Sequence, residues 1–149
     1  MTRSRTTILL AEDDENDAFL FRRALGKAGL SHELVRVCNG EECIGYLRGI
    51  SRFEDRDQYP LPNLLVLDLK MPGVSGLDVL DWLQTQPALK QIPAVMLSGS
   101  GLAPDRQAAL AKGAKEYHAK PVGFAALVEI LKGLSARWLT PDASPGAGK

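Results

Sequence analysis

A continuous apolar run from Leu64 to Leu67, followed at once by Asp68, constrains the fold of this chain more than any other stretch. Because the run does not alternate between apolar and polar residues, it is typical of a strand covered on both faces, as in the parallel sheet of an α/β domain. Pro72 and Gly73 then turn the chain, which places Asp68 at the carboxyl end of the strand, where such sheets bind ligands. A carboxylate at that position needs a compensating metal ion, cation or bound phosphate.

Four further strands and five helices are predicted around this run. Apolar runs at 6–12 and 94–98 predict buried strands, and 116–119 is predicted to be a short fifth strand. The alternating segment 33–38 predicts a short strand at a sheet edge. Apolar residues at helical spacing predict helices over 16–29, 40–47, 76–86, 104–112 and 124–138. Because crossovers between parallel strands are right-handed, the alternation predicts a doubly wound, five-stranded parallel sheet. We expect the strand order 2-1-3-4-5 of the flavodoxin-like α/β fold.

Length and local composition indicate a single domain in this chain of 149 residues. We expect the fold to span 6–139, after a flexible N-terminus at 1–5 and before a disordered C-terminal tail at 140–149, which is rich in Pro, Gly, Ala and Ser. The charged segment 48–62 is predicted to be a surface extension. The last helix is predicted to bury one face against the sheet, formed by Phe124, Leu127, Val128, Leu131, Leu134 and Trp138.

Charge, hydropathy and cysteine content argue against several classes of function. Acidic and basic residues balance at 18 each, so no net field favours nucleic acid or an anionic membrane. No apolar run approaches the ~20 residues that cross a bilayer, and no cleavable leader follows the basic first residues. Cys38 and Cys43 have no companion pair, which predicts two reduced, mostly buried thiols rather than a disulfide framework or a zinc site. We therefore expect a cytoplasmic protein that binds neither nucleic acid nor a membrane.

Polar side chains stand at the ends of four predicted strands. Glu12 and Asp13 follow the first strand, Asp68 follows the third, Ser98 ends the fourth and Lys120 follows the fifth. In a sheet of order 2-1-3-4-5 these ends lie side by side above one crevice. Three acids in an open pocket favour a hard divalent cation, and Mg²⁺ is the predicted cofactor. A carboxylate beside a metal and a lysine can attack phosphorus and form an aspartyl phosphate, which the hydroxyl and the ammonium would stabilise.

At these residues the sequence resembles the receiver domains of two-component response regulators, which are CheY-like. The matching motifs stand in the family's order and spacing: Glu12–Asp13, the loop from Asp68 to Gly76, Ser98, and Lys120–Pro121. Tyr117 matches the aromatic switch position of the family. The resemblance covers roughly residues 6–139 and implies a phosphorelay protein.

The resemblance implies a role for each matching residue. Asp68 would accept a phosphoryl group from a histidine kinase, and Lys120 would pair with the phosphoryl oxygens. Ser98 would move toward the phosphate, and Tyr117 would swing into the space that Ser98 vacates. The added charge of the phosphoryl group would shift the equilibrium between two conformations of one surface, which is formed by 104–112, 116–119 and 124–138.

The same resemblance implies a magnesium site. Asp13 and Asp68 would bind Mg²⁺ directly, together with the backbone carbonyl of Lys70. Glu12 would act through water or as a further ligand. The side chain of Lys70 places a long cation beside Asp68, and Gly99 after Ser98 is expected to loosen the neighbouring loop. These two departures from the family's commonest pattern leave the lifetime of the phosphoryl group open.

A narrower resemblance concerns the segment before the Asp68 strand and the stretch from Ser135 to Leu139. Both are similar to the single-domain regulators that accompany bacterial phytochrome kinases. This resemblance implies a phytochrome-type photoreceptor kinase as partner. No segment resembles an output domain, so we expect a stand-alone regulator that signals through partner binding or through a homodimer formed by 104–112, 116–119 and 124–138.

Three other functions are compatible with this fold. An aspartate-nucleophile phosphatase would need an acid two residues after Asp68, where this chain has Lys70. A flavin-binding domain would need a Ser/Thr/Gly phosphate cradle after the first strand, where this chain has acids from Glu12 to Asp14. A pseudo-receiver acting only as a protein-interaction module is the alternative, although the intact set of site residues argues against it. We therefore predict a protein that catalyses its own phosphorylation and dephosphorylation but is not an enzyme on outside substrates.

Overall fold

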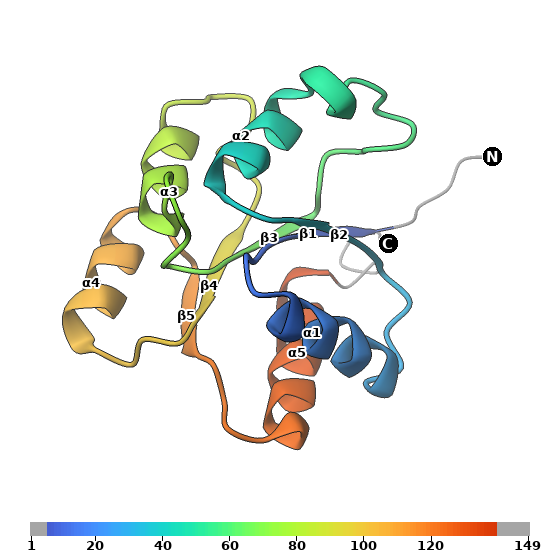
Figure 1. Ribbon diagram of the computed structural model, residues 1–149, viewed down its shortest axis with the longest axis vertical. Coiled ribbons are helices and arrows are strands. Elements are labelled where there is room, and N and C mark those ends of the chain that lie inside the picture. Colours follow the sequence, from blue (N-terminus) through green and yellow to red (C-terminus); the bar gives the residue numbers. More distant parts are fainter. Residues whose placement is uncertain (1–5, 140–149) are drawn as a thin grey trace, which may run out of the picture.

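A computed structural model describes residues 6–139 of the chain. Its elements run in the order β1 (Thr7–Ala11), α1 (Glu15–Lys27), β2 (Glu33–Val37), α2 (Gly40–Arg48), the 3-10 turn η1 (Ser51–Phe53), β3 (Leu64–Leu67), α3 (Gly76–Gln84), β4 (Ala94–Ser98), α4 (Ala103–Ala111), β5 (Glu116–Ala119) and α5 (Phe124–Trp138). The sheet forms the middle layer, with α2, α3 and α4 on one face and α1 and α5 on the other (Figure 1). The predicted flexible ends, 1–5 and 140–149, lie outside the described residues.

The strands pair in the order β2-β1-β3-β4-β5, and every pair is parallel. This confirms the predicted doubly wound fold. In the register of the sheet, Ala11 lies opposite Leu67, Leu67 opposite Met96, and Ser98 opposite Ala119. The carboxyl ends of β1, β3, β4 and β5 therefore finish close together along one edge of the sheet.

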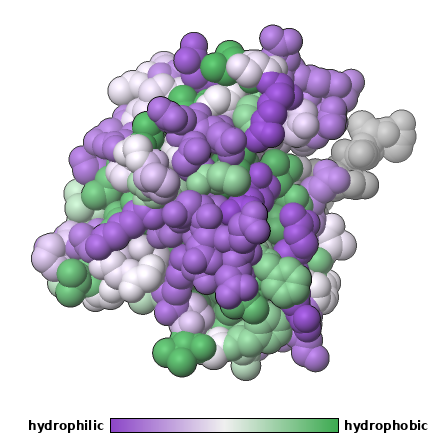
Figure 2. Space-filling view, in the orientation of Figure 1, coloured by the Kyte–Doolittle hydropathy of each residue, from purple (hydrophilic) through white to green (hydrophobic). Residues whose placement is uncertain are grey.

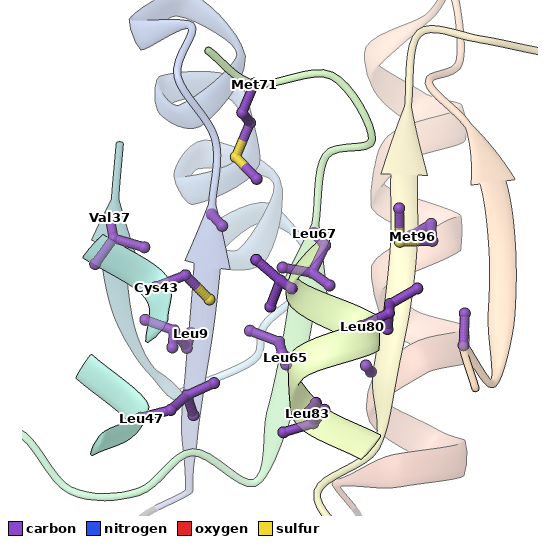
Figure 3. Close-up of a cluster of buried hydrophobic side chains, with 14 of the residues drawn as sticks. Leu9, Val37, Cys43, Leu47, Leu65, Leu67, Met71, Leu80, Leu83 and Met96 are labelled. Atoms are coloured by element: carbon purple, nitrogen blue, oxygen red, sulfur yellow. The ribbon is translucent and has the colours of Figure 1, made fainter. Parts of the chain in front are cut away.

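Successive strand residues face two separate apolar cores, because side chains alternate across a strand. On β3, Leu65 faces the core that it shares with Leu80 and Leu83 of α3 (Figure 3). Its neighbour Leu64 faces the opposite core with Phe21 of α1. Burial of both faces explains why the inner strands are continuous apolar runs rather than alternating ones.

The connection between α2 and β3 is packed more tightly than its charged sequence suggests. Phe53 of η1 is buried, and its ring contacts the rings of Tyr46 and Tyr59. The guanidinium of Arg56 donates hydrogen bonds to the backbone carbonyls of Tyr46, Tyr59 and Leu47 at 2.8, 3.1 and 2.8 Å. The predicted surface extension is therefore an ordered element, and its aromatic side chains join the core on the α2, α3 and α4 face of the sheet.

Three predicted details are wrong. Helix α1 begins at residue 15, earlier than expected, because the side chain of Asp14 accepts a hydrogen bond from the amide of Asp17 and caps the helix. Phe124 opens α5 with 37% of its surface exposed instead of packing on the sheet. Cys43 is buried as expected, but Cys38 is exposed.

Hydrophilic side chains form a broad band across the middle of the face shown in Figure 2, and hydrophobic residues appear over the region of α1 and α5. Large apolar side chains exposed in that region include Phe19, Leu20, Val122 and Phe124. Within 6–139, every helix is too short or too polar to cross a bilayer.

Candidate functional site

The predicted site residues meet at the carboxyl ends of four strands. The amide of Asp68 donates to the carbonyl of Ala11 on β1 at 3.1 Å, and the amide of Lys120 donates to the carbonyl of Ser98 on β4 at 2.7 Å. These backbone bonds hold the four chain segments side by side above the sheet. The four segments surround an open pocket of about 500 Å³. It is lined by Glu12, Asp13, Asp14, Asp17, Asp68, Lys70, Ser98, Gly99, Ser100, Gly101, Leu102 and Lys120.

The ammonium of Lys120 contacts three carboxylates in this pocket. Its Nζ lies 2.7 Å from Asp17 Oδ2, 2.8 Å from Glu12 Oε1 and 3.3 Å from Asp68 Oδ2. The contacts with Glu12 and Asp68 agree with the predicted constellation. The contact with Asp17 was not predicted, because Asp17 lies at the start of the helix predicted over 16–29 rather than at a strand end. A carboxylate in the turn that follows β1 could have been assigned to the same crevice, since that turn stands directly above the strand end.

Burial and neighbouring groups shift the pKa values of Glu12 and Lys120. Burial raises the pKa of Glu12 to about 7, and the charge of Asp68 adds to this, while Lys120 and the amide of Asp14 act in the opposite direction. Burial lowers the pKa of Lys120, but hydrogen bonds to Asp17 and Glu12 and the nearby acid charges outweigh it, so the pKa lies above its usual value. Lys120 therefore stays charged at neutral pH.

The acids of the pocket fit a divalent cation. One carboxylate oxygen from each of Glu12, Asp13 and Asp68 lies within 4.8 Å of the others. Asp13 is exposed to the pocket mouth, whereas Glu12 and Asp68 are buried. A set of oxygen donors open to solvent on one side is the arrangement that Mg²⁺ and Mn²⁺ favour, since these hard ions retain several waters.

The two predicted switch residues lie around the loop after β4. Ser98 is buried, and its Oγ accepts a hydrogen bond from the amide of Ser100 at 3.4 Å. Tyr117 is also buried, and its hydroxyl donates to the carbonyl of Ser100 at 2.7 Å. Arg106 of α4 donates to the carbonyl of Tyr117 at 3.3 Å. Tyr117 thus links β5, α4 and the loop beside Ser98, while the movement of the two residues stays a prediction.

The loop after Asp68 is held by the start of α3. The amide of Gly76 donates to the carbonyl of Leu69 at 3.0 Å. A Cβ atom at Gly76 would lie only 2.3 Å from the carbonyl oxygen of Asp68, so the close approach requires glycine. Ser75 and Asp78 form a reciprocal capping box at the helix start. The backbone around Asp68 is therefore positioned by an element with a defined first turn.

Comparison with known proteins places this architecture in a family. Residues 8–132 match the response regulator receiver domain. Response regulator Rcp1 of Synechocystis sp. is 31% identical over 140 residues, which are 94% of this chain and 93% of Rcp1. The crystal structure of the Mn²⁺-bound form of Rcp1 has a TM-score of 0.79 and 30% identity, over 90% of this chain and 94% of that one.

Two further solved structures are similar over nearly the whole chain. Response regulator RPA3017, from red light signaling of R. palustris, has a TM-score of 0.86 and 31% identity, over 91% of this chain and 94% of that one. The phosphorylated cyanobacterial phytochrome response regulator RcpA has a TM-score of 0.83 and 32% identity, over 93% and 96%. These similarities do not favour the pseudo-receiver alternative. The chain belongs to the response regulator receiver domain family of two-component phosphorelays.

Proposed function

We propose that Asp68 of this receiver domain accepts a phosphoryl group from a histidine kinase, with Mg²⁺ bound in the acidic pocket. One observation carries the proposal. The carboxylate of Asp68 stands at the end of β3, 3.3 Å from the Lys120 ammonium and within 4.8 Å of the nearest oxygens of Glu12 and Asp13. The pocket therefore brings together the Asp68 carboxylate as nucleophile, the Lys120 ammonium as a fixed positive charge, and acidic ligands for Mg²⁺.

The transfer is a displacement at phosphorus. A carboxylate oxygen of Asp68 attacks the phosphorus of a phosphohistidine, and the P–N bond breaks. Its electron pair returns to the imidazole nitrogen, which then takes up a proton, and the phosphoryl group remains on Asp68 as an acyl phosphate. Lys120 pairs with one phosphoryl oxygen, and Ser98 donates a hydrogen bond to another. A bound Mg²⁺ supplies further positive charge to the phosphoryl oxygens.

The hydrogen bonds of the acids support a division of roles around Mg²⁺. Both oxygens of Glu12 already accept hydrogen bonds, from Lys120 Nζ at 2.8 Å and from the amide of Asp14 at 3.1 Å. The oxygens of Asp68 accept longer and weaker ones, from Lys120 Nζ at 3.3 Å and from the amide of Lys70 at 3.4 Å. We therefore assign Glu12 a contact through water. Asp13 and Asp68 are assigned as direct ligands, together with the backbone carbonyl of Lys70.

Intact-mass measurement tests the proposal. The chain is incubated with acetyl phosphate, with Mg²⁺ or with EDTA, as wild type and as Asp68→Asn. We expect the wild type to gain one phosphoryl group in the presence of Mg²⁺ only, and the variant to gain none. Equal uptake by both proteins would contradict the assignment of Asp68. The same reactions with a generic phosphoester should show no turnover, because we propose that catalysis is confined to the chain's own phosphorylation and dephosphorylation.

The similarity to RcpA and RPA3017 supports a phytochrome-type histidine kinase as the phosphoryl donor. We further propose a cytoplasmic location and a homodimer through α4, β5 and α5, a surface that Tyr117 and Arg106 connect to the pocket. Mass measurement in solution, with and without a phosphoryl mimic, tests the dimer. A monomer under both conditions would contradict it.

A further inference from the structure

Asp17 takes part in the pocket although the chemistry of phosphoryl transfer does not call for it. Its carboxylate makes the shortest of the three contacts of Lys120, at 2.7 Å. The side chains of Glu12 and Asp68 are 4% and 9% exposed and that of Lys120 is 22% exposed, whereas Asp17 is 40% exposed. Asp17 thus holds the ammonium from the solvent side, while Glu12 and Asp68 hold it from inside.

The first turn of α1 frees the Asp17 carboxylate for this contact. In α3, the acid at the third helical position, Asp78, bonds back to the amide of the capping residue Ser75 at 3.0 Å. Asp17 occupies the same position in α1 and donates its own amide to Asp14 at 3.0 Å. However, the amide of Asp14 is already bound to Glu12 Oε2 at 3.1 Å. The Asp17 side chain is therefore not needed for the cap and turns to Lys120 instead.

An ammonium has three N–H donors, and the three carboxylates account for all of them. Two donors are held by Glu12 and Asp17 at 2.8 and 2.7 Å, and the third reaches Asp68 at 3.3 Å. A phosphoryl oxygen on Asp68 can take this third donor while the other two bonds persist. We propose that Asp17 is a positioning residue: it fixes the Lys120 ammonium with one donor directed at Asp68 and at the phosphoryl group attached there. This inference rests on the proposed function and adds a residue to it.

Electrostatics agrees with this geometry. Burial lowers the pKa of Lys120, and the hydrogen bond to Asp17 is the strongest of the influences that raise it again. Without Asp17, the long and flexible lysine side chain keeps one short bond, to Glu12. The ammonium can then turn its N–H donors to water. Each phosphoryl transfer must again restrict the lysine side chain to one conformation, and this loss of conformational entropy slows the reaction.

Phosphorylation kinetics test the proposal. With acetyl phosphate and Mg²⁺, we expect Asp17→Ala to take up the phosphoryl group about tenfold more slowly than the wild type. Asp17→Asn keeps an acceptor oxygen and should fall between the two. The control is Glu15→Ala, which removes an exposed acid from the same first turn of α1 outside the pocket; it should react at the wild-type rate. A slow rate in Glu15→Ala as well would assign the effect to the helix and overturn the proposal.

A double-mutant comparison separates positioning from a structural role. In a Lys120→Gln background, Asp17→Ala should cause no further slowing, because its effect acts through the ammonium. An equal slowing in both backgrounds, or a wild-type rate for Asp17→Ala alone, would overturn the proposal.

A second readout does not depend on activity. We expect the Nζ–H protons of Lys120, followed by NMR, to exchange with water more slowly in the wild type than in Asp17→Ala. Equal exchange would overturn the positioning role. If the wild type takes up no phosphoryl group, the proposed function fails, and this exchange measurement still decides whether Asp17 holds the ammonium.

Discussion

At the scale of single residues, the pocket depends on Lys120 to offset the charges of its acids. Glu12 and Asp68 are buried on the strand ends, where ionised carboxylates are poorly solvated. The Lys120 ammonium lies within 3.3 Å of both, and within the same distance of Asp17. Removing one partner of a buried charge cluster costs more than the cluster itself contributes, because the remaining charges are left unpaired.

Lys120→Gln should therefore lower the free energy of unfolding by about 2 kcal/mol in EDTA. Mg²⁺ should restore part of this loss, because the ion replaces the missing positive charge. Urea unfolding in EDTA and in Mg²⁺ measures both effects. Lys112→Gln is the control, since Lys112 pairs with Asp81 on the surface at 2.9 Å and should change stability by less than about 1 kcal/mol. Equal stability of Lys120→Gln and the wild type in EDTA would refute this charge balance.

At the scale of elements, α3 sets the position of the Asp68 loop through its first residue. A methyl group at Gly76 would meet the Asp68 carbonyl oxygen at 2.3 Å and its carbonyl carbon at 3.0 Å. Helix and loop would have to move apart, and the hydrogen bond from Gly76 to Leu69 would break. A glycine elsewhere in a helix has no such constraint, and alanine there is the better helix former.

Gly76→Ala should lower the free energy of unfolding by at least about 2 kcal/mol and slow the phosphorylation of Asp68. Gly26→Ala in α1 is its matched control, because nothing lies within 4 Å of a Cβ at that position. This control should gain about 0.5 kcal/mol. Urea unfolding of both variants tests the contrast, which fails if the two changes have the same sign.

Glu116 joins β5 to the last turn of α5. Its carboxylate accepts hydrogen bonds from Arg137 Nε and Nη2 at 2.6 and 2.7 Å and from Trp138 Nε1 at 2.8 Å. A nitrogen of His118 lies 2.8 Å from the same carboxylate. The hydrogen bonds from Arg137 lower the pKa of Glu116 to about 2, against the effect of burial, and those from His118 and Trp138 add to the shift. The ionised form is thus favoured by folding.

Because its pKa is lower in the folded chain, ionised Glu116 stabilises the fold fully at pH values above its ordinary pKa of 4.5. This stabilisation is lost as the pH falls from 4.5 through about 2. Between these pH values the wild type should lose more free energy of unfolding than Glu116→Gln, which has no proton to take up at this position. Urea unfolding at a series of pH values measures the difference. Parallel pH profiles for the two proteins would contradict this prediction, because they would mean that Glu116 has the same pKa in the folded and the unfolded chain.

At the scale of the whole molecule, the fold could be predicted because each inner strand is covered on both faces. The apolar run before Asp68 and its counterparts before Glu12 and at Ser98 carry that information locally. Once the strands were placed, the right-handed crossover rule gave a doubly wound sheet, and in the order 2-1-3-4-5 the four polar strand ends lie together. The positions of Glu12, Asp68, Ser98 and Lys120 in one pocket followed from the topology.

The features that could not be predicted depend on contacts between segments far apart in the sequence, which no local sequence pattern reveals. The pairing of Asp17 with Lys120 crosses 103 residues and depends on which acid the helix cap leaves free. The connection between α2 and β3 is ordered because Arg56 donates hydrogen bonds to three backbone carbonyls, and the local sequence does not reveal these partners. Phe124 continues the apolar period of α5 yet is the first residue of the helix and is exposed there.

The most direct test of the account is to locate the phosphoryl group. The wild-type chain is phosphorylated with acetyl phosphate and Mg²⁺ and then reduced with borohydride, which converts an aspartyl phosphate to homoserine; its peptides are mapped by mass. We expect conversion at Asp68 and none at Asp13 or Asp17. Conversion at another acid, or a phosphorylated chain with Asp68 unchanged, would contradict it.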